Sequence, residues 1–371
     1  MNPAIENTVP ETPRAQKKQR TDAAVSAYGA LCAFMLGVQI IIDATGRAAR
    51  EAGNAMVFTA LSPVVCALLL LALITRVRRR HDMQSLPAIY LAVWGRVFGS
   101  AACVMTSLVF LADVLCALAG LQALGHARLL PVQHADATFL PALAASAVVA
   151  SLAGEGLERL AFLARRAIPV LLLALSVLLV WREEISNLFP LFGFRLSRTV
   201  QSAFFSSGAA ACVLASGFSP IRLSNAAPIR AKSLLTSGCC AFVLLVLISL
   251  STPQSAMRLP DAWPALLIHT GIRTQGSGLF HIAVVVLECF ALLIALCGGI
   301  LLSIRALEGL WGRTASCVCI FTLCMLGAGA IVLWGSDWVR VMMPFRFIPA
   351  LLLPLLTLLN DLLRTRRSET V

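Results

Sequence analysis

The sequence predicts an all-α integral membrane protein with ten transmembrane helices, arranged as a five-plus-five inverted repeat in which helices 1 and 6 are broken. Of its 371 residues, 59% are hydrophobic and 13% are charged, whereas a soluble domain carries about 25% charged residues. The apolar residues form runs near the ~20 residues that cross a hydrocarbon core. Most of these runs lack the polar face that a helix on the surface of a soluble protein presents.

Ten apolar runs give the predicted spans and the domain boundaries. Residues 1–22 are polar and contain three prolines, so we expect a disordered cytoplasmic tail there and no cleavable signal peptide. The ten-helix membrane domain then covers residues 23–364, and residues 365–371 form a second cytoplasmic tail. The predicted spans are 24–48, 55–75, 97–124, 138–153, 167–181, 200–219, 233–252, 279–304, 314–334 and 345–363.

The distribution of basic residues predicts the orientation, because Lys and Arg concentrate in the cytoplasmic loops of membrane proteins. With the N-terminus inside, ten spans place twenty of the thirty basic residues on the cytoplasmic side. The other ten, with Arg346 among them, fall on the outer side or at span ends. We therefore expect both termini and the loop 76–96 to be cytoplasmic, and the loops 125–137 and 253–278 to face outward.

Composition and motifs argue against several other classes of protein. The net charge of +12 does not indicate a nucleic-acid partner, because the basic residues lie in short clusters between apolar runs. The twelve cysteines lie inside those runs, where cysteine behaves as a small hydrophobe, and their spacing does not match a zinc site. We expect no metal and no cofactor. The motifs of zinc proteases, serine hydrolases and P-loop proteins are missing from the sequence, so an enzyme is not expected.

Spans 1 and 6 are corresponding helices of the two halves, and both contain interruptions. Transporters built from inverted repeats bind their substrates at such discontinuous helices, where free backbone groups and helix ends meet charged ligands. Span 1 contains a glycine and polar residues at depth, and span 6 contains a Ser-Ser-Gly sequence that we expect to be unwound. The alternative is that these small residues serve close helix packing. The candidate ligand-binding residues in the two spans are Gly37, Val38, Gln39, Phe204, Ser206, Ser207 and Gly208.

Two further candidates are carboxyl groups inside predicted spans. Asp113 lies in span 3 and Glu288 lies in span 8. An ionisable group at membrane depth is expensive and is commonly functional, although a structural contact with a neighbouring helix is the alternative. Because leucine would remove a costly polar group, we expect Asp113→Leu and Glu288→Leu to leave insertion unaffected.

Several short motifs resemble those of one membrane protein family. They are Gly154-Glu-Gly-Leu-Glu-Arg159 before span 5, Asn187-Leu-Phe-Pro-Leu-Phe-Gly193 before span 6, Glu51-Ala-Gly53 after span 1, and looser matches at 264–268 and 307–310. Over residues 26–363 the chain thereby resembles the spore germination permease family, the B subunits of Ger-type germinant receptors. The resemblance implies the fold of the amino acid–polyamine–organocation superfamily.

The resemblance also implies a function and partners. It implies a germinant receptor B subunit that binds a small-molecule germinant, such as an amino acid, within the membrane domain and triggers spore germination. The implied partners are an A subunit and a lipoprotein C subunit, in the inner membrane of a bacterial spore. The first alternative is a secondary amino acid transporter of the bacterial cell membrane, and a more remote one is an intramembrane enzyme.

Overall fold

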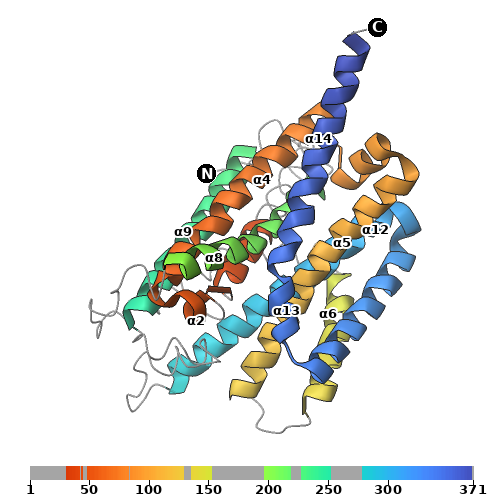
Figure 1. Ribbon diagram of the computed structural model, residues 1–371. Helices are drawn as coiled ribbons and strands as arrows, with labels where there is room; N and C mark the ends of the chain where they lie inside the picture. The colour runs from red at the N-terminus through yellow and green to blue at the C-terminus, as the bar shows by residue number, and fades with distance from the viewer. Residues whose placement is uncertain are drawn as a thin grey trace, which may run out of the picture.

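The computed structural model describes residues 31–41, 43–44, 48–82, 84–128, 135–152, 196–218, 227–251 and 278–369. Within these ranges every regular element is a helix, as the sequence predicts (Figure 1). In the described part of the chain, five helices are long and apolar enough to cross a membrane. The protein is therefore a multi-pass α-helical membrane protein. These five helices are Met56–Arg80, Leu86–Gln122, Leu196–Phe218, Cys289–Trp334 and Pro344–Leu363.

The described elements have the following order along the chain. A shorter apolar helix, Leu31–Ile41, comes first. The elements after it are α2 (Ala49–Ala52), η2 (Gly53–Ala55), α3 (Met56–Thr59), α4 (Leu61–Arg80), α5 (Leu86–Arg128), α6 (Ala135–Ser151), α8 (Leu196–Ser206), η4 (Ser207–Phe218), α9 (Ala227–Ser251), α12 (Gly278–Trp334), α13 (Asp337–Met342), η5 (Pro344–Arg346) and α14 (Phe347–Glu369).

Two of the long helices are bent at a glycine. Gly95 in α5 has φ 75° and Gly312 in α12 has φ 78°, a backbone conformation that side chains with a Cβ rarely adopt. Each glycine follows a tryptophan and precedes an arginine. The bend at Gly312 divides α12 into two segments, which correspond to the predicted spans 279–304 and 314–334. The bend at Gly95 sets the start of the predicted third span.

The number of spans and the inverted repeat remain predictions. The predicted fifth span, 167–181, lies outside the described residues, and so do the motifs before spans 5 and 6. Part of the predicted first span, 24–48, also lies outside them, and its regular helix is described over Leu31–Ile41.

The predicted sixth span changes its helix type instead of unwinding. The α-helix α8 ends at Ser206, and the chain continues as the 3₁₀-helix η4 from Ser207 to Phe218. A 3₁₀-helix has about three residues per turn, and runs longer than 3–4 residues are uncommon. The expectation of an unwound Ser-Ser-Gly stretch was therefore wrong in form, although the α-helix does end within that stretch.

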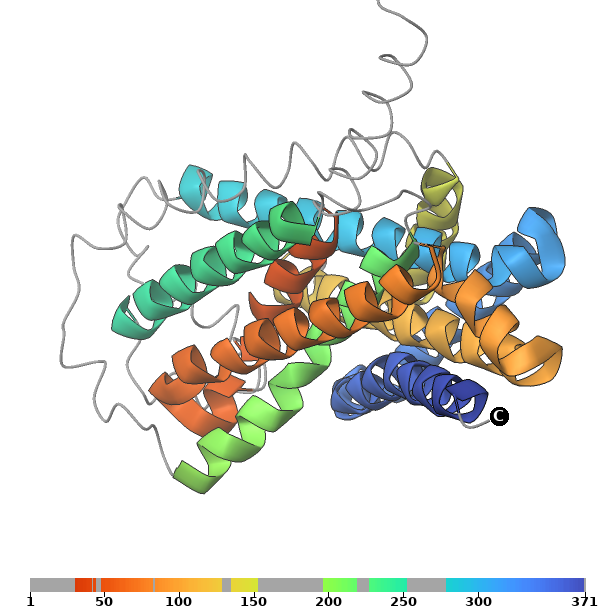
Figure 2. The same cartoon turned by 90° about the horizontal axis from the view of Figure 1, so that it is seen from above.

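The core has two parts, and η4 lies in the first. One cluster joins η4 to the helix Leu31–Ile41, α4 and the beginning of α5. The other joins α5, α6 and α12. Every residue of η4 is buried, and Figure 2 shows the green segment that follows α8 passing through the middle of the bundle. A centrally placed, irregular helix is thus surrounded by the longer helices.

The predicted orientation can be checked by cysteine labelling. Arg79 lies exposed in the last turn of α4, at the start of the loop expected to be cytoplasmic. In a cysteine-free background, we expect Arg79→Cys to react with an impermeant maleimide only after the membrane is opened. Gln133→Cys, in the loop 125–137, is the matched control and should react in intact cells. Labelling of position 79 in intact cells would overturn the predicted topology.

Candidate functional site

A buried ion pair lies where several helices meet. Asp113 of α5 is 2% exposed, and Arg346 of η5 is 4% exposed. The Nη1 atom of Arg346 forms an ion pair with Oδ1 of Asp113. Opposite charges attract far more strongly in an apolar interior than in water. The pair therefore ties η5 to α5.

Gln39 bridges the two charged groups. Its Nε2 donates a hydrogen bond to Oδ1 of Asp113 at 2.6 Å, and its Oε1 accepts one from Nη2 of Arg346 at 2.5 Å. The amide thus presents its donor to the carboxylate and its acceptor to the guanidinium, which is the only orientation that satisfies both neighbours. This closed triangle brings the helix Leu31–Ile41 into the same site.

The beginning of η4 supplies a backbone acceptor. Arg346 Nε donates a hydrogen bond to the carbonyl oxygen of Gly208 at 2.8 Å. We expected backbone groups of this segment to meet the charged end of a ligand, but in this structure a guanidinium of the chain occupies that carbonyl. Gln39, Asp113, Gly208 and Arg346 are called the central polar cluster below.

A second polar contact joins the same two predicted spans. Ser206 Oγ donates a hydrogen bond to Oδ2 of Asp43 at 2.5 Å. The Asp43 carboxylate also interacts electrostatically with Arg346. The last residue of α8 is thus fixed to the C-terminal side of span 1, beside the central polar cluster.

The central polar cluster retains unused hydrogen-bonding capacity. Among the described residues, Oδ2 of Asp113 has no hydrogen-bond partner, and Nη1 of Arg346 has only its ion pair. A buried polar atom without a partner is costly and calls for an explanation, such as an unfilled binding site. Oδ2 of Asp113 can therefore accept a hydrogen bond from a donor group of a ligand, whereas Nη1 of Arg346 is engaged by Oδ1 of Asp113.

The structure brings only some of the predicted site residues into this cluster. Gln39, Asp113 and Gly208 belong to it, and Ser206 lies beside it through Asp43. Val38 packs against both core clusters. These residues come from the predicted spans 1, 3 and 6.

Other predicted site residues have different surroundings. A Cβ added to Gly37 would lie 2.5 Å from Oγ of Ser237 in α9, so this glycine permits close packing. Ser207 donates its hydroxyl to the carbonyl of Phe204 within the helix, and Phe204 itself is 64% exposed. Glu288 lies in α12, and its side chain lies outside what the structure describes.

Arg346 is the member of the central polar cluster that the sequence analysis missed. It was counted among outer or span-end arginines, whereas it is buried and paired. The signal was present in Pro344-Phe345-Arg346-Phe347, a single cation at the start of an apolar run. Because a buried Asp113 requires an opposite charge, the search for its partner could have led there.

Among the described residues, no three or more His, Cys, Asp and Glu side chains gather as metal ligands do. The side chains that meet in the cluster are an amide, a carboxylate and a guanidinium. Side chains of these types can form hydrogen bonds with charged organic groups.

No family model and no curated protein matches the chain. Its course is similar to a crystal structure of the Eremococcus coleocola manganese transporter in complex with an aromatic bis-isothiourea substituted compound, with a TM-score of 0.47 and 15% sequence identity. The alignment covers 94% of this chain and 79% of that chain. Manganese is the substrate named for that transporter and is not assigned to this chain.

Proposed function

We propose that this chain is a secondary transporter of small charged solutes, with amino acids as the leading class, and that the central polar cluster is its binding site. The observation that carries this proposal is the buried Asp113–Arg346 pair, in which Oδ2 of Asp113 has no hydrogen-bond partner among the described residues. A membrane-embedded ion pair beside the end of an α-helix is typical of a substrate pathway.

Stability alone gives no reason for such a pair. Well-packed apolar residues in place of a buried ion pair are often neutral or stabilising. A zwitterionic solute gives a reason, because its carboxylate matches the guanidinium of Arg346 and its ammonium group matches the carboxylate of Asp113. Binding would replace the Asp113–Arg346 ion pair by two ion pairs with the solute, so neither buried side chain would lack a counter-charge.

Such an exchange also provides a conformational response. The solute would separate Asp113 from Arg346, and Arg346 holds Gly208 and Gln39 in the closed arrangement. A ligand shifts a conformational equilibrium only by the difference in its affinity for the two states. Here the difference in affinity would arise because the solute replaces the contacts of the Arg346 guanidinium with Asp113, Gln39 and Gly208.

Uptake into proteoliposomes tests this proposal. We expect purified protein to accumulate at least one member of a radiolabelled amino acid mixture, and we expect Arg346→Lys to raise the KM about tenfold or more. Lysine keeps the charge but cannot form two parallel hydrogen bonds with a carboxylate. Arg96→Lys, at an exposed position of α5, is the matched control and should transport as the wild type does. Wild-type protein that accumulates none of the mixture, or an unchanged KM for Arg346→Lys, would contradict the proposal.

A germinant receptor B subunit is the second candidate, and the sequence motifs favour it. One of them, Glu51-Ala52-Gly53, ends α2 with Gly53 at φ 61°, so its glycine is required by the turn. A receptor of this kind would use the same cluster to bind a germinant in complex with A and C subunits. It would bind the solute without accumulating it, and the uptake assay therefore separates the two functions.

A further inference from the structure

The 3₁₀-helix η4 is unusually long and lies deep in the protein. It covers twelve residues, Ser207–Phe218, all of them buried, whereas most 3₁₀ segments end after 3–4 residues because their hydrogen-bond geometry is poorer. It packs against α4, α5 and α14. A 3₁₀-helix of this length must be stabilised by contacts with the helices around it.

The beginning of η4 is held by Arg346 and by a close backbone contact. Arg346 Nε donates to the Gly208 carbonyl at 2.8 Å. A Cβ on Gly208 would lie 2.5 Å from the carbonyl oxygen of Met343, which precedes η5. The first residues of η4 therefore cannot turn or slide while η5 remains in place.

The other end is held by a second buried arginine. Arg78, in the last turn of α4, is 1% exposed and donates from Nη1 to the carbonyl of Ser216 at 3.0 Å. Its Nε donates to the carbonyl of Gln84 at 2.9 Å, in the turn before α5. Arg79 and Arg80, its neighbours in the basic run, are exposed. Arg78 therefore links η4 to the α4–α5 turn.

The two arginines fix the length of η4. A 3₁₀-helix rises about 2.0 Å per residue and an α-helix about 1.5 Å, so the eight residue steps from Gly208 to Ser216 would shorten by roughly 4 Å on conversion. The turn per residue would also fall from about 120° to about 100°, which would rotate the two held carbonyls relative to each other by roughly 160°. Neither change is possible while both end carbonyls keep their guanidinium donors.

We propose that η4 is a length-changing element of the membrane domain, held in its extended 3₁₀ form by Arg346 at one end and Arg78 at the other. Release of either arginine lets the segment convert toward an α-helix, which moves the end near Ser216 relative to the α4–α5 turn. Arg78 is a positioning residue in this scheme, because it acts on the central polar cluster only through η4. The proposal goes beyond solute binding and does not require it.

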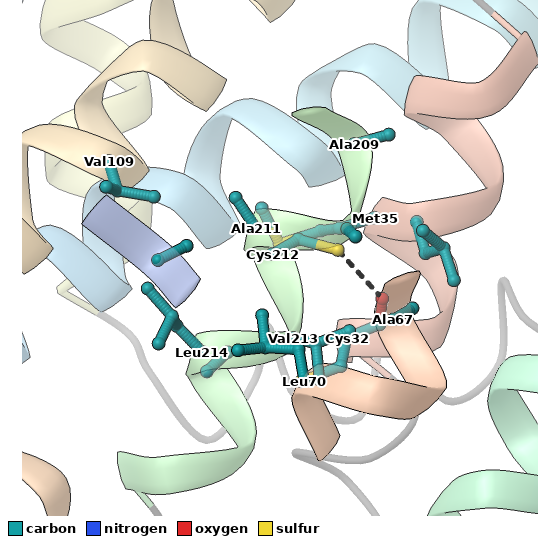
Figure 3. Close-up of a cluster of buried hydrophobic side chains, with 14 of the residues drawn as sticks. Cys32, Met35, Ala67, Leu70, Val109, Ala209, Ala211, Cys212, Val213 and Leu214 are labelled. Atoms are coloured by element: carbon teal, nitrogen blue, oxygen red, sulfur yellow. Dashed lines mark hydrogen bonds between the residues drawn. The ribbon is translucent and has the colours of Figure 1, made fainter. Parts of the chain in front are cut away.

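The chain contains a probe of this change in the middle of η4. Cys212 is fully buried, and its thiol donates to the carbonyl of Cys32 at 3.7 Å (Figure 3). Conversion would turn the Cys212 side chain away from Cys32. Cys212 is four residues from Gly208, and each residue turns about 20° less in an α-helix than in a 3₁₀-helix, which gives a rotation of about 80°. The fully buried thiols of Cys103 in α5 and Cys324 in α12 report whether the rest of the protein opens.

Alkylation of these thiols in lipid nanodiscs, without any solute, tests the proposal. We expect Arg78→Gln to speed the reaction of Cys212 with N-ethylmaleimide about tenfold or more over wild type, while Cys103 and Cys324 keep their rates. Arg79→Gln, one residue away and exposed, is the matched control and should change none of the three rates. Arg78→Lys keeps the charge but cannot hold both carbonyls in the same way, so it should give an intermediate rate at Cys212.

Hydrogen exchange over residues 207–218 separates conversion from unfolding, because an α-helix keeps its amides protected and an unfolded segment does not. An unchanged rate at Cys212 in both Arg78 variants would overturn the proposal. Equal acceleration of all three thiols, or loss of protection over 207–218, would also overturn it, since Arg78 would then support the fold as a whole. Because no solute is present, failure here is distinguishable from a failure of the uptake assay.

Discussion

Replacement of Arg346 alone by methionine is expected to destabilise the folded protein by about 3–5 kcal/mol, because it leaves the charge of Asp113 buried without a counter-charge. Replacement of Asp113 alone by leucine should cost a similar amount. The double variant with both replacements should be about as stable as the wild type, or more stable, because no buried charge remains.

A double-mutant cycle measures this coupling. Unfolding in detergent is followed for the wild type, the two single variants and the double variant, and the interaction energy is the departure from additivity. Arg313→Met, at an exposed position in α12, is the matched control and should shift stability by less than about 0.5 kcal/mol. Additive effects of the two replacements would show that the pair is not coupled. Retained uptake in the double variant would remove the cluster from the proposed function.

The ion pair with Arg346 changes what we expect of the replacement of Asp113. We expected Asp113→Leu to leave the protein inserted, because leucine removes a costly polar group. That reasoning treated the carboxyl group as unpaired. Since Arg346 forms an ion pair with it, Asp113→Leu leaves the buried charge of Arg346 without a counter-charge. Only replacement of both residues leaves no buried charge unpaired.

The second large effect concerns the start of η4. We expect Gly208→Leu to abolish most of the folded yield, and Gly208→Ala to destabilise the protein by about 1–3 kcal/mol. An added Cβ would lie 2.5 Å from the carbonyl oxygen of Met343 and 3.1 Å from the Cα of Pro344. Both neighbours are backbone atoms, which cannot move aside as a flexible side chain can. The shift would also displace the carbonyl that Arg346 uses.

Gly329→Leu, near the C-terminal end of α12, is the matched control, because nothing lies within 4 Å of the Cβ it would carry. It should give a normal yield after detergent extraction and size-exclusion chromatography. Normal yield of Gly208→Leu with lost uptake would instead mean that the residue leaves space for the solute. Normal yield together with normal uptake would remove Gly208 from the site.

Much of the fold could be predicted because it depends on local composition. Apolar runs near the thickness of a bilayer predict helices wherever they occur, and the bends at Gly95 and Gly312 agree with predicted span boundaries. Asp113 and Gln39 could be identified as candidates because polar groups are costly at membrane depth, whatever their partners are. The fifth span and the orientation stay predictions.

The pairing of Asp113 with Arg346 could not be predicted in the same way. The two residues lie far apart in the sequence, and whether an arginine near a span end is a topology determinant or a buried partner depends on how η5 packs. The same limit applies to Arg78, which the sequence places in an ordinary basic run while the structure buries it against Ser216 and Gln84.

The amino-acid sequence thus predicts a helical membrane protein with costly polar residues in the predicted spans 1, 3 and 6, since hydropathy and run length can be read along the chain without knowing its contacts. The folded arrangement shows in addition which charges meet, that Gly208 lies against the backbone of Met343, and that the segment after Ser206 is a 3₁₀-helix. These features depend on contacts between segments distant in sequence. The energy of such a contact is set by the distance and burial of both partners, which no single stretch of sequence contains.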